Sequence, residues 1–398
     1  MHILAVSEQG VTLRAEGDLL VVERGSSRLR QVRVNEIDQV ILLGRVEVRS
    51  AALSLLLRRG IELVLLTQQG TFRGRLSGRA AKNVALRLAQ YGRSSDPAFC
   101  LRIARKVVAA KIHNQRSLLL RAQRKLQDNA LAQALGSLRV VATRTENTAS
   151  LDELRGLEGH AAALYFGHFG KLIRNPAFQF DHRNRRPPRD PVNALLSFGY
   201  AVMGSLVETD VYRCGLDPML GFLHQPDYGR ASLMLDALEV FRPMIDSLVL
   251  RLINRRQIGV GDFVRQSTKT VEEILSDQPN TLAELPFDEE PDVLQPPSGD
   301  EVEPTEVPAT GVTTSGADDG KTGGNGSGQR GDSSWAVLLS DVGRRIFLHE
   351  LFRRMREKML YPPRSATYEI RDIVREQVYH LARVIAGEEN EFEPFVPA

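Results

Sequence analysis

Three acidic side chains and one histidine are the residues whose type and spacing could support chemistry. Glu158 lies on a stripe of apolar residues in a segment with helical periodicity. A carboxylate on such a stripe is costly unless it is paired, protonated or bound to a metal ion. Taken alone, Glu158 also fits an edge position from which its side chain reaches solvent, so this residue by itself does not identify a site.

Asp236 and Glu239 stand three residues apart in a second helical segment, and His224 precedes that segment. The spacing places both carboxylates on one face of a helix, where like charges repel mildly, so we expect a cation near them. Taken alone, the two acids also fit a solvated helix face, and a histidine beside apolar residues is often structural.

Together these four side chains predict a site for a divalent ion. One imidazole with two or three carboxylates, in which oxygen ligands dominate, suits Mg²⁺ or Mn²⁺ better than structural zinc. Phosphodiester chemistry needs such an ion to activate the attacking water or hydroxyl and to neutralise the charge that builds on the phosphoryl oxygens. The spacing alone is not decisive without a fold.

The elements that must position these residues fall into two kinds. We expect residues 1–75 to form a β-rich domain with one helix, at 51–59. Strands are predicted where short apolar runs occur, at 11–15, 19–23, 29–34, 40–43, 46–50 and 61–66. Helical periodicity follows at 81–91, 98–126, 150–173, 191–213, 230–252, 335–359 and 367–385. Pro243 predicts a kink. We therefore expect an α+β multidomain protein with a small β-strand-rich N-terminal domain and an all-helical C-terminal catalytic domain.

Charge divides the chain of 398 residues in a different way. The net charge is +3, but residues 277–332 hold 13 acidic and two basic residues, a net charge of −11, so the remaining residues carry +14. Prolines, glycines and few large apolar residues predict that this acidic stretch is a disordered insert. The insert would divide the helical domain into 76–276 and 333–390. The basic remainder favours a polyanionic partner.

Basic residues are densest between Thr71 and Lys125, where 14 lysines and arginines accompany a single acid, Asp96. In the predicted helix 98–126 they alternate with apolar residues and are Arg102, Arg105, Lys106, Lys111 and Arg116. Such a face is often only solvated, but the excess of one sign favours a surface that meets phosphates.

Several classes of protein are excluded. Two cysteines do not make a disulfide framework or a cysteine-based zinc module. No apolar run approaches the roughly 18 residues that a membrane span needs, and the first residues do not resemble a secretory signal, so a cytoplasmic protein without a membrane partner is expected. No phosphate-binding Walker loop and no Gly-x-Ser-x-Gly nucleophile elbow is present.

The residues around these candidate ligands resemble those of a known family. Blocks at 155–159, 190–200, 215–218 with 221–224, and 230–243, in this order, resemble the CRISPR-associated Cas1 family of spacer acquisition. Ala162, Tyr165, Phe166 and the pair Asn114-Gln115 add to the likeness. The resemblance covers nearly the whole chain outside 277–332.

The resemblance implies a metal-dependent DNA endonuclease and integrase that inserts short foreign DNA segments as new spacers into a CRISPR array by 3′-hydroxyl transesterification. It places the metal ligands on Glu158, His224 and Glu239, with Asp236 as a further catalytic acid in the same site. It also implies a homodimer through the N-terminal domain, a Cas2 dimer as partner, and binding of protospacer DNA, repeat DNA and branched or single-stranded nucleic acid. By position, Arg183, Arg185, Arg186, Arg230 and Arg242 are plausible phosphate contacts.

Two alternatives stay open from the sequence. The chain could be a DNA-binding scaffold without catalysis, or a structure-specific nuclease outside spacer acquisition. The acidic insert is the feature that the family does not explain, either as a surface loop or as a competitor of DNA for the basic surface.

Overall fold

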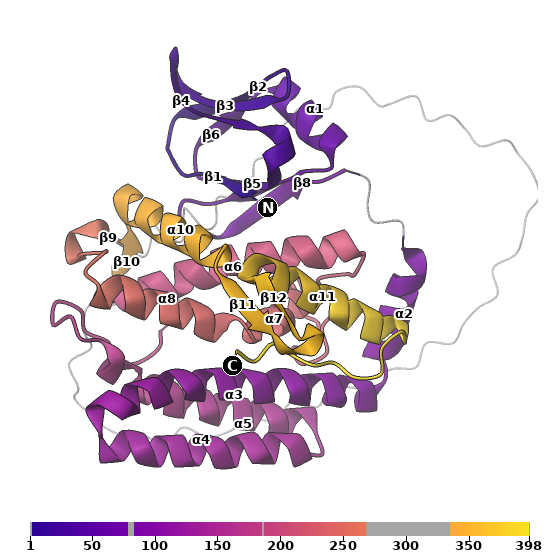
Figure 1. Cartoon of the computed structure of the whole chain (residues 1–398), viewed down its shortest axis with the longest axis vertical. Helices are drawn as coiled ribbons and strands as arrows, with labels where there is room; N and C mark the ends of the chain where they lie inside the picture. The colour runs from indigo at the N-terminus through magenta and orange to yellow at the C-terminus, as the bar shows by residue number, and fades with distance from the viewer. Residues whose placement is uncertain (1, 79–82, 185–186, 268–334, 398) are drawn as a thin grey trace, which may run out of the picture.

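A computed structural model describes residues 2–78, 83–184, 187–267 and 335–397 (Figure 1). Its N-terminal part contains two four-stranded sheets and a helix. The elements are β1 His2–Val6, β2 Val11–Glu16, β3 Leu19–Arg24, β4 Ser27–Arg33, β5 Ile37–Leu43, β6 Val46–Val48, α1 Ser50–Arg59, β7 Glu62–Leu66 and β8 Phe72–Leu76. The strands and the helix expected within 1–75 are therefore present, together with β1 and β8, which the sequence did not predict.

The two sheets differ in their strand pairing. One has the order β4-β3-β2-β6, with antiparallel pairs except for the parallel pair β2–β6. The other has the order β1-β5-β7-β8, in which β1, β5 and β7 are parallel and β8 is antiparallel. A parallel sheet is usually covered on both faces, and its strands then read as unbroken apolar runs, as β5 does.

The second sheet joins the N-terminal part to the rest of the chain. Along β5 the side chains alternate: Val40 and Leu42 belong to the core shared with the first sheet, whereas Ile41 and Leu43 belong to the core of the helical part. Because successive strand residues point to opposite faces, this one strand contributes to both cores.

The helical part forms layers around a buried central helix (Figure 1). Its elements before the acidic stretch are α2 Val84–Ser94, α3 Pro97–Leu126, α4 Asn129–Asn147, α5 Leu151–Phe169, α6 Pro191–Cys214, α7 Ser232–Glu239 and α8 Arg242–Asn254. Helices α3, α4 and α5 lie side by side below α6 in the view of Figure 1. Helix α6 is apolar nearly all round, as expected for a helix enclosed by its neighbours.

Residues at the helix ends explain where several of these helices begin. Asp190 and Ser150 accept hydrogen bonds from the backbone N–H groups of Asn193 and Glu153, so both cap their helices. The expected helix 230–252 is instead two helices, because the chain turns after Glu239 and Pro243 stands in the first turn of α8, where proline is tolerated.

The C-terminal part corrects the expectation of an all-helical domain. It contains β9 Phe263–Ser267, β10 Trp335–Leu339, α10 Asp341–Met355, β11 Lys358–Tyr361, β12 Ala366–Glu369 and α11 Ile370–Ala386. Residues 335–339, predicted as the start of a helix, pair instead with β9 in an antiparallel ribbon. Four consecutive buried side chains in that strand explain the error, since a short apolar run does not distinguish a strand from a buried helix.

The acidic stretch 277–332 lies outside the described residues. Within the described ranges no helix combines the length and apolar character that crossing a membrane requires.

Candidate metal centre

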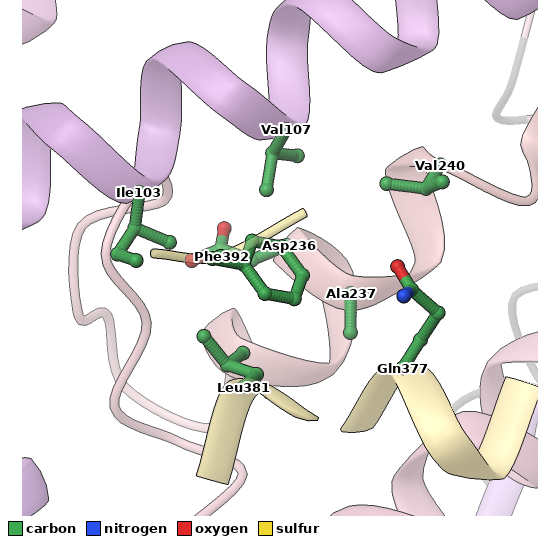
Figure 2. Close-up of a pocket in the computed structure, with 8 residues that line it drawn as sticks. All are labelled: Ile103, Val107, Asp236, Ala237, Val240, Gln377, Leu381 and Phe392. Carbon is green, nitrogen blue, oxygen red and sulfur yellow. The ribbon is translucent and has the colours of Figure 1, made fainter. Parts of the chain in front are cut away.

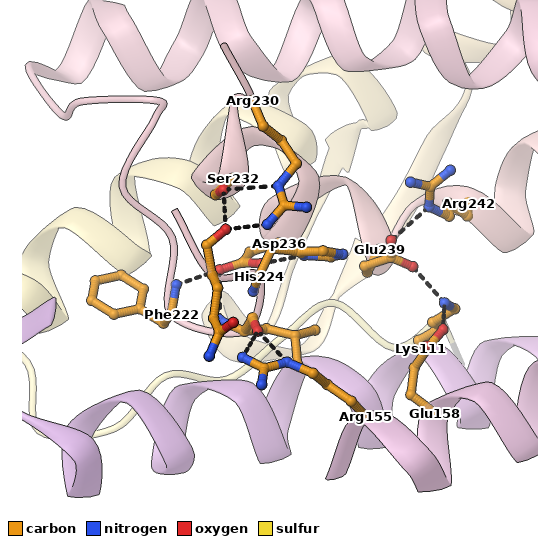
Figure 3. A network of polar contacts seen from close by, with 12 residues as sticks. Lys111, Arg155, Glu158, Phe222, His224, Arg230, Ser232, Asp236, Glu239 and Arg242 are labelled. Atoms are coloured by element: carbon orange, nitrogen blue, oxygen red, sulfur yellow. Dashed lines mark hydrogen bonds and ion pairs between the residues drawn. The ribbon is translucent and has the colours of Figure 1, made fainter. Parts of the chain in front are cut away.

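Asp236 anchors the loop that carries His224. It is 1% exposed and accepts hydrogen bonds from the backbone N–H groups of Phe222 at 2.5 Å, Leu223 at 2.9 Å and His224 at 3.0 Å. The Nδ1 atom of His224 lies 2.6 Å from Oδ1 of the same carboxylate. Asp236 therefore holds both the backbone and the ring of His224, and its oxygens are occupied by the loop (Figure 3).

Gly221 makes this close approach possible. A Cβ atom at this position would lie 2.7 Å from Oδ2 of Asp236 and 2.8 Å from the backbone carbon of Ser232. Carbon atoms do not approach carboxylate oxygen or backbone so closely, so the loop needs a glycine here to pass over the start of α7.

Arg155 supports the loop from the opposite side. Its Nε and Nη2 atoms donate to the carbonyl oxygen of Leu223 at 3.2 and 2.9 Å. Arg155 lies on α5, one turn before Glu158. The residue before His224 is thus held by the helix that also carries Glu158.

Glu158 and Glu239 come from α5 and α7 and are joined by a lysine of α3. Lys111 Nζ lies 2.6 Å from Oε2 of Glu239 and also pairs with Oε1 of Glu158. Lys111 and Glu239 are buried, whereas the side chain of Glu158 is 28% exposed. The expected cation beside the acids is therefore a residue of the chain, and Glu158 forms the open side of the cluster.

Arg242 is the second cation of the cluster. Its Nε donates to Oε1 of Glu239 at 2.8 Å, and its guanidinium lies 4.7 Å from the centre of the Tyr200 ring. Burial alone would raise the pKa of Glu239, but Arg242 and Lys111 outweigh it and lower the pKa to about 2. Glu239 is therefore ionised throughout the neutral range although it is buried.

The four candidate residues lie on neighbouring elements, but they are not equivalent. Glu158 and Glu239 share the ammonium of Lys111, and in Figure 3 the His224 ring extends from Asp236 toward Glu239. Asp236 sits behind the ring, with the loop around its oxygens.

The chemistry of these donors fits a divalent ion. Glu158 and Glu239 meet at Lys111, the His224 ring extends toward Glu239, and the histidine already has a carboxylate on its other ring nitrogen, as metal-bound histidines usually do. A cation already lies between Glu158 and Glu239, in the form of the Lys111 ammonium. Among the described residues, no group of three or more His, Cys, Asp or Glu side chains is arranged to hold an ion as it stands.

The cavity behind Asp236 is too small to hold a substrate. The cavity behind Asp236 has a volume of about 10 Å³ and is closed by apolar side chains such as Phe392, with Gln377 on one wall (Figure 2). This volume is close to what a single water molecule needs. A substrate would therefore reach the cluster from the side of Glu158.

The arginines expected at phosphates lie in different surroundings. Arg183 donates to Asn193 at 2.7 Å and to Ser197 at 3.1 Å, and Arg242 is turned inward to Glu239. Arg230 is half-buried, donates to the backbone of Gln225 and lies 3.4 Å from Asp227. Arg185 and Arg186 are outside the described residues.

The basic face expected on 98–126 contacts the chain itself. Arg102 and Arg105 donate to the backbone oxygens of Asn390 and Thr148, Lys106 lies 3.5 Å from Glu391, and Arg116 donates to Leu135. Lys111 is buried at the acidic cluster.

Lys111 is the residue of the cluster whose role was not predicted, although the sequence held a signal for it. It was grouped with the basic face of its helix, yet it continues the buried stripe that Ala104, Val107 and Val108 begin at helical spacing. A lysine within such a stripe needs a buried acidic partner, and this signal was present in the sequence.

The chain matches the family model described as "CRISPR associated protein Cas1" over residues 4–279. It is 43% identical over 272 residues to the "CRISPR-associated exonuclease Cas4/endonuclease Cas1 fusion" of Geobacter sulfurreducens, a match that covers 66% of this chain and 49% of the fusion. It is 40% identical over 279 residues to "CRISPR-associated endonuclease Cas1 2" of Rhodospirillum rubrum, covering 67% of this chain and 79% of that protein. The chain thus spans about half the length of the fusion.

Solved structures show the same fold at low identity. A "Casposase bound to integration product" superposes with a TM-score of 0.73 at 18% identity, covering 100% of this chain and 95% of that one. A chain of a "Cas6-RT-Cas1--Cas2 complex" superposes with a TM-score of 0.71 at 20% identity, covering 99% of this chain and 36% of that one. These similarities extend the shared fold beyond residue 279.

Proposed function

The chain belongs to the Cas1 family of CRISPR-associated proteins, and on that premise we propose that it is a metal-dependent DNA endonuclease and integrase. Its reaction would insert short foreign DNA segments as new spacers into a CRISPR array by 3′-hydroxyl transesterification. The observation that supports this most directly is that Glu158 of α5 and Glu239 of α7 meet at Lys111, with the ring of His224 extending from its loop toward Glu239. A scaffold that only binds DNA would not need this buried acidic cluster, so we favour the enzyme.

Glu158 and Glu239 would bind Mg²⁺ or Mn²⁺ through carboxylate oxygens, and His224 through Nε2, because Asp236 holds its Nδ1. A divalent ion bound there supplies Lewis acidity to the phosphodiester and activates the attacking hydroxyl or water. Asp236 keeps His224 in one orientation, and Arg242 keeps Glu239 charged. We assign Asp236 to positioning within the catalytic site.

The partially exposed side of the cluster is where DNA would enter. Arg230 is the candidate phosphate contact closest in sequence to the site helix α7, and Arg183 with Arg185 and Arg186 would act from the loop before α6. Phosphate contacts of this kind position the substrate and carry no sequence information.

The proposed partners follow from the relatives. A solved neighbour is bound to an integration product and another is a complex that contains Cas2. We propose that this chain binds protospacer and repeat DNA, accepts branched or single-stranded nucleic acid, forms a homodimer through residues 1–75, and assembles with a Cas2 dimer.

A joining assay tests the assignment. Wild type and Glu158→Ala are incubated with Cas2, a protospacer duplex, a plasmid that carries the repeat, and Mn²⁺ or Mg²⁺. We expect Glu158→Ala to lose several orders of magnitude in joining rate, since the ion supplies several kcal/mol to the transition state.

Glu146→Ala is the matched control, because Glu146 is an exposed carboxylate on the neighbouring helix α4 and forms no ion pair with a residue of the cluster among the described residues. It should join at the wild-type rate. Equal joining by wild type and Glu158→Ala would contradict the assignment of the metal site.

A further inference from the structure

Lys111 is a buried ammonium with an unusual environment. The residue is 6% exposed and stands on α3 among Val107, Val108 and Ile112, all of them buried. A charged side chain in such surroundings is strongly unfavourable unless it is paired. The pairing of Lys111 therefore has to be close to complete.

Both partners of Lys111 are residues that we propose as metal ligands. Its Nζ pairs with Oε1 of Glu158 and lies 2.6 Å from Oε2 of Glu239. The one ammonium therefore neutralises charge on both carboxylates. The ammonium of Lys111 thus neutralises the two carboxylates that a bound metal ion would otherwise neutralise.

The two cations of the cluster are not interchangeable. Arg242 binds the other oxygen of Glu239 and lies over the Tyr200 ring, and it does not reach Glu158 among the ion pairs of the described residues. Lys111 joins the two carboxylates. An ammonium on a flexible four-carbon stem can change its position more readily than a planar guanidinium held by an aromatic ring.

Charge balance then opposes the entry of a metal ion. Glu158 and Glu239 carry two negative charges, and Lys111 with Arg242 carries two positive charges, so a dication would enter a neutralised pair. Removing one resident cation restores net negative charge to the two carboxylates.

We propose that Lys111 is the resident counter-ion of Glu158 and Glu239, which a divalent ion must displace, so that Lys111 weakens metal binding to this site. This inference rests on the proposed function, because it takes Glu158 and Glu239 as metal ligands. Lys111 holds the two carboxylates together in the metal-free protein, and its displacement lowers the net affinity for the ion.

The first test measures Mn²⁺ binding to the full chain without DNA, by electron paramagnetic resonance of the free ion. Lys111→Met keeps the length of the side chain and removes its charge. We expect this variant to bind Mn²⁺ at least about tenfold more tightly than wild type, which corresponds to 1.4 kcal/mol or more. In the presence of a chelator it should melt below wild type, and Mn²⁺ should raise its melting temperature by more than it raises that of wild type.

Lys106→Met is the matched control. Lys106 stands on the same helix, but its side chain is 46% exposed and lies 3.5 Å from Glu391, and among the described residues it forms no ion pair with Glu158 or Glu239. Its affinity for Mn²⁺ should equal that of wild type. An affinity of Lys111→Met equal to or weaker than that of wild type would overturn the inference.

A second measurement uses the wild-type residue and does not depend on the stability of the Met variant. The ¹⁵N signal of the Lys111 ammonium, identified by its loss in Lys111→Arg, is recorded while Mg²⁺ is added. We expect it to shift or broaden as the site saturates. An unchanged signal at saturation would contradict displacement.

The two proposals can fail separately. If neither wild type nor Lys111→Met binds Mn²⁺, the metal site and the proposed function are wrong. If both bind it with equal affinity, the site stands and the role of Lys111 is wrong.

Discussion

Two buried carboxylates follow each other along the chain at the inner side of the cluster, Glu239 at the end of α7 and Asp246 in α8. Glu239 pairs with Arg242 and Lys111, which lower its pKa to about 2. Asp246 accepts hydrogen bonds from the hydroxyl groups of Tyr165, at 2.9 Å, and Tyr200. Burial raises the pKa of Asp246 to about 6, although both phenols favour its charged form.

The difference lies in the charge of the partners. Burial disfavours the ionised form of both residues, but Glu239 forms ion pairs with Lys111 and Arg242, whereas Arg183 and Arg242 affect the pKa of Asp246 less than its two phenol hydrogen bonds do. Neutral donors soften the cost of burial and do not cancel it. Lys111 and Arg242 thus keep Glu239 ionised at neutral pH, whereas the pKa of Asp246, which is held mainly by phenols, lies close to neutral pH.

Tyr200 links the two regions. Its hydroxyl donates to Asp246, and the guanidinium of Arg242 lies over its ring. A substitution at Glu239 can therefore affect Asp246, and the reverse. Replacing one carboxylate at a time tests whether their roles differ.

The largest expected effect is on activity. Glu239→Gln removes the ionised ligand, so the joining rate should fall by several orders of magnitude. Asp246→Asn keeps the shape of the side chain and an amide that can exchange hydrogen bonds with both phenols, so the rate should stay within a few-fold of wild type. Equal losses in the two variants would show that the two carboxylates do not have separate roles.

The second expected effect is on stability. Arg242→Met leaves buried Glu239 with Lys111 alone, and removing one member of a buried ion pair costs roughly 3 kcal/mol or more. Denaturant unfolding of the metal-free protein measures this change. Arg255→Met, at an exposed position just after α8, is the control and should change stability by no more than about 0.5 kcal/mol. A loss as small as that of the control would contradict the importance of Arg242 for Glu239.

The smallest expected effect is a pH dependence that belongs to Asp246. Because its pKa is raised from 3.8 to about 6 on folding, the folded protein binds this proton more tightly than the unfolded chain. The resulting stabilisation is complete below pH 3.8 and is lost as the pH rises through about 6. A shift of this size corresponds to about 2–3 kcal/mol.

Asp246→Asn isolates that contribution from those of the other carboxylates. The unfolding free energies of wild type and variant are measured from pH 4 to pH 7.5. The value for wild type minus the value for the variant should fall by about 2–3 kcal/mol over this range. The difference should be flat above pH 7. Parallel curves over the whole range would show that Asp246 does not titrate in this window.

Much of the local structure could be predicted from residue patterns. Ser150 and Asp190 identify the starts of two helices because a capping side chain acts within three residues of its own position. The strands from β2 to β7 follow from short apolar runs between turns, whereas β1 and β8 were not predicted. The pairing of Trp335–Leu339 with β9 was not predictable in the same way, because it depends on a strand far away in the sequence.

For the candidate site too, the residue types could be predicted from the sequence, whereas the contacts between distant residues could not. The residue types at Glu158, His224 and Glu239 are a property of the sequence, and they indicate oxygen-rich metal chemistry before any fold is known. The separate position of Asp236 was not evident, because its three backbone donors belong to a loop that only the folded chain brings to it.

The sequence by itself determined most of the long helices, most of the N-terminal strands, the acidic stretch and the residue types of the site, because each depends on neighbouring residues. The tertiary structure alone decided which charge meets which, and it placed Lys111 of α3 between Glu158 of α5 and Glu239 of α7. The physical reason is that a buried charge is stabilised by whatever lies within a few ångströms of it, and those neighbours come from distant parts of the chain.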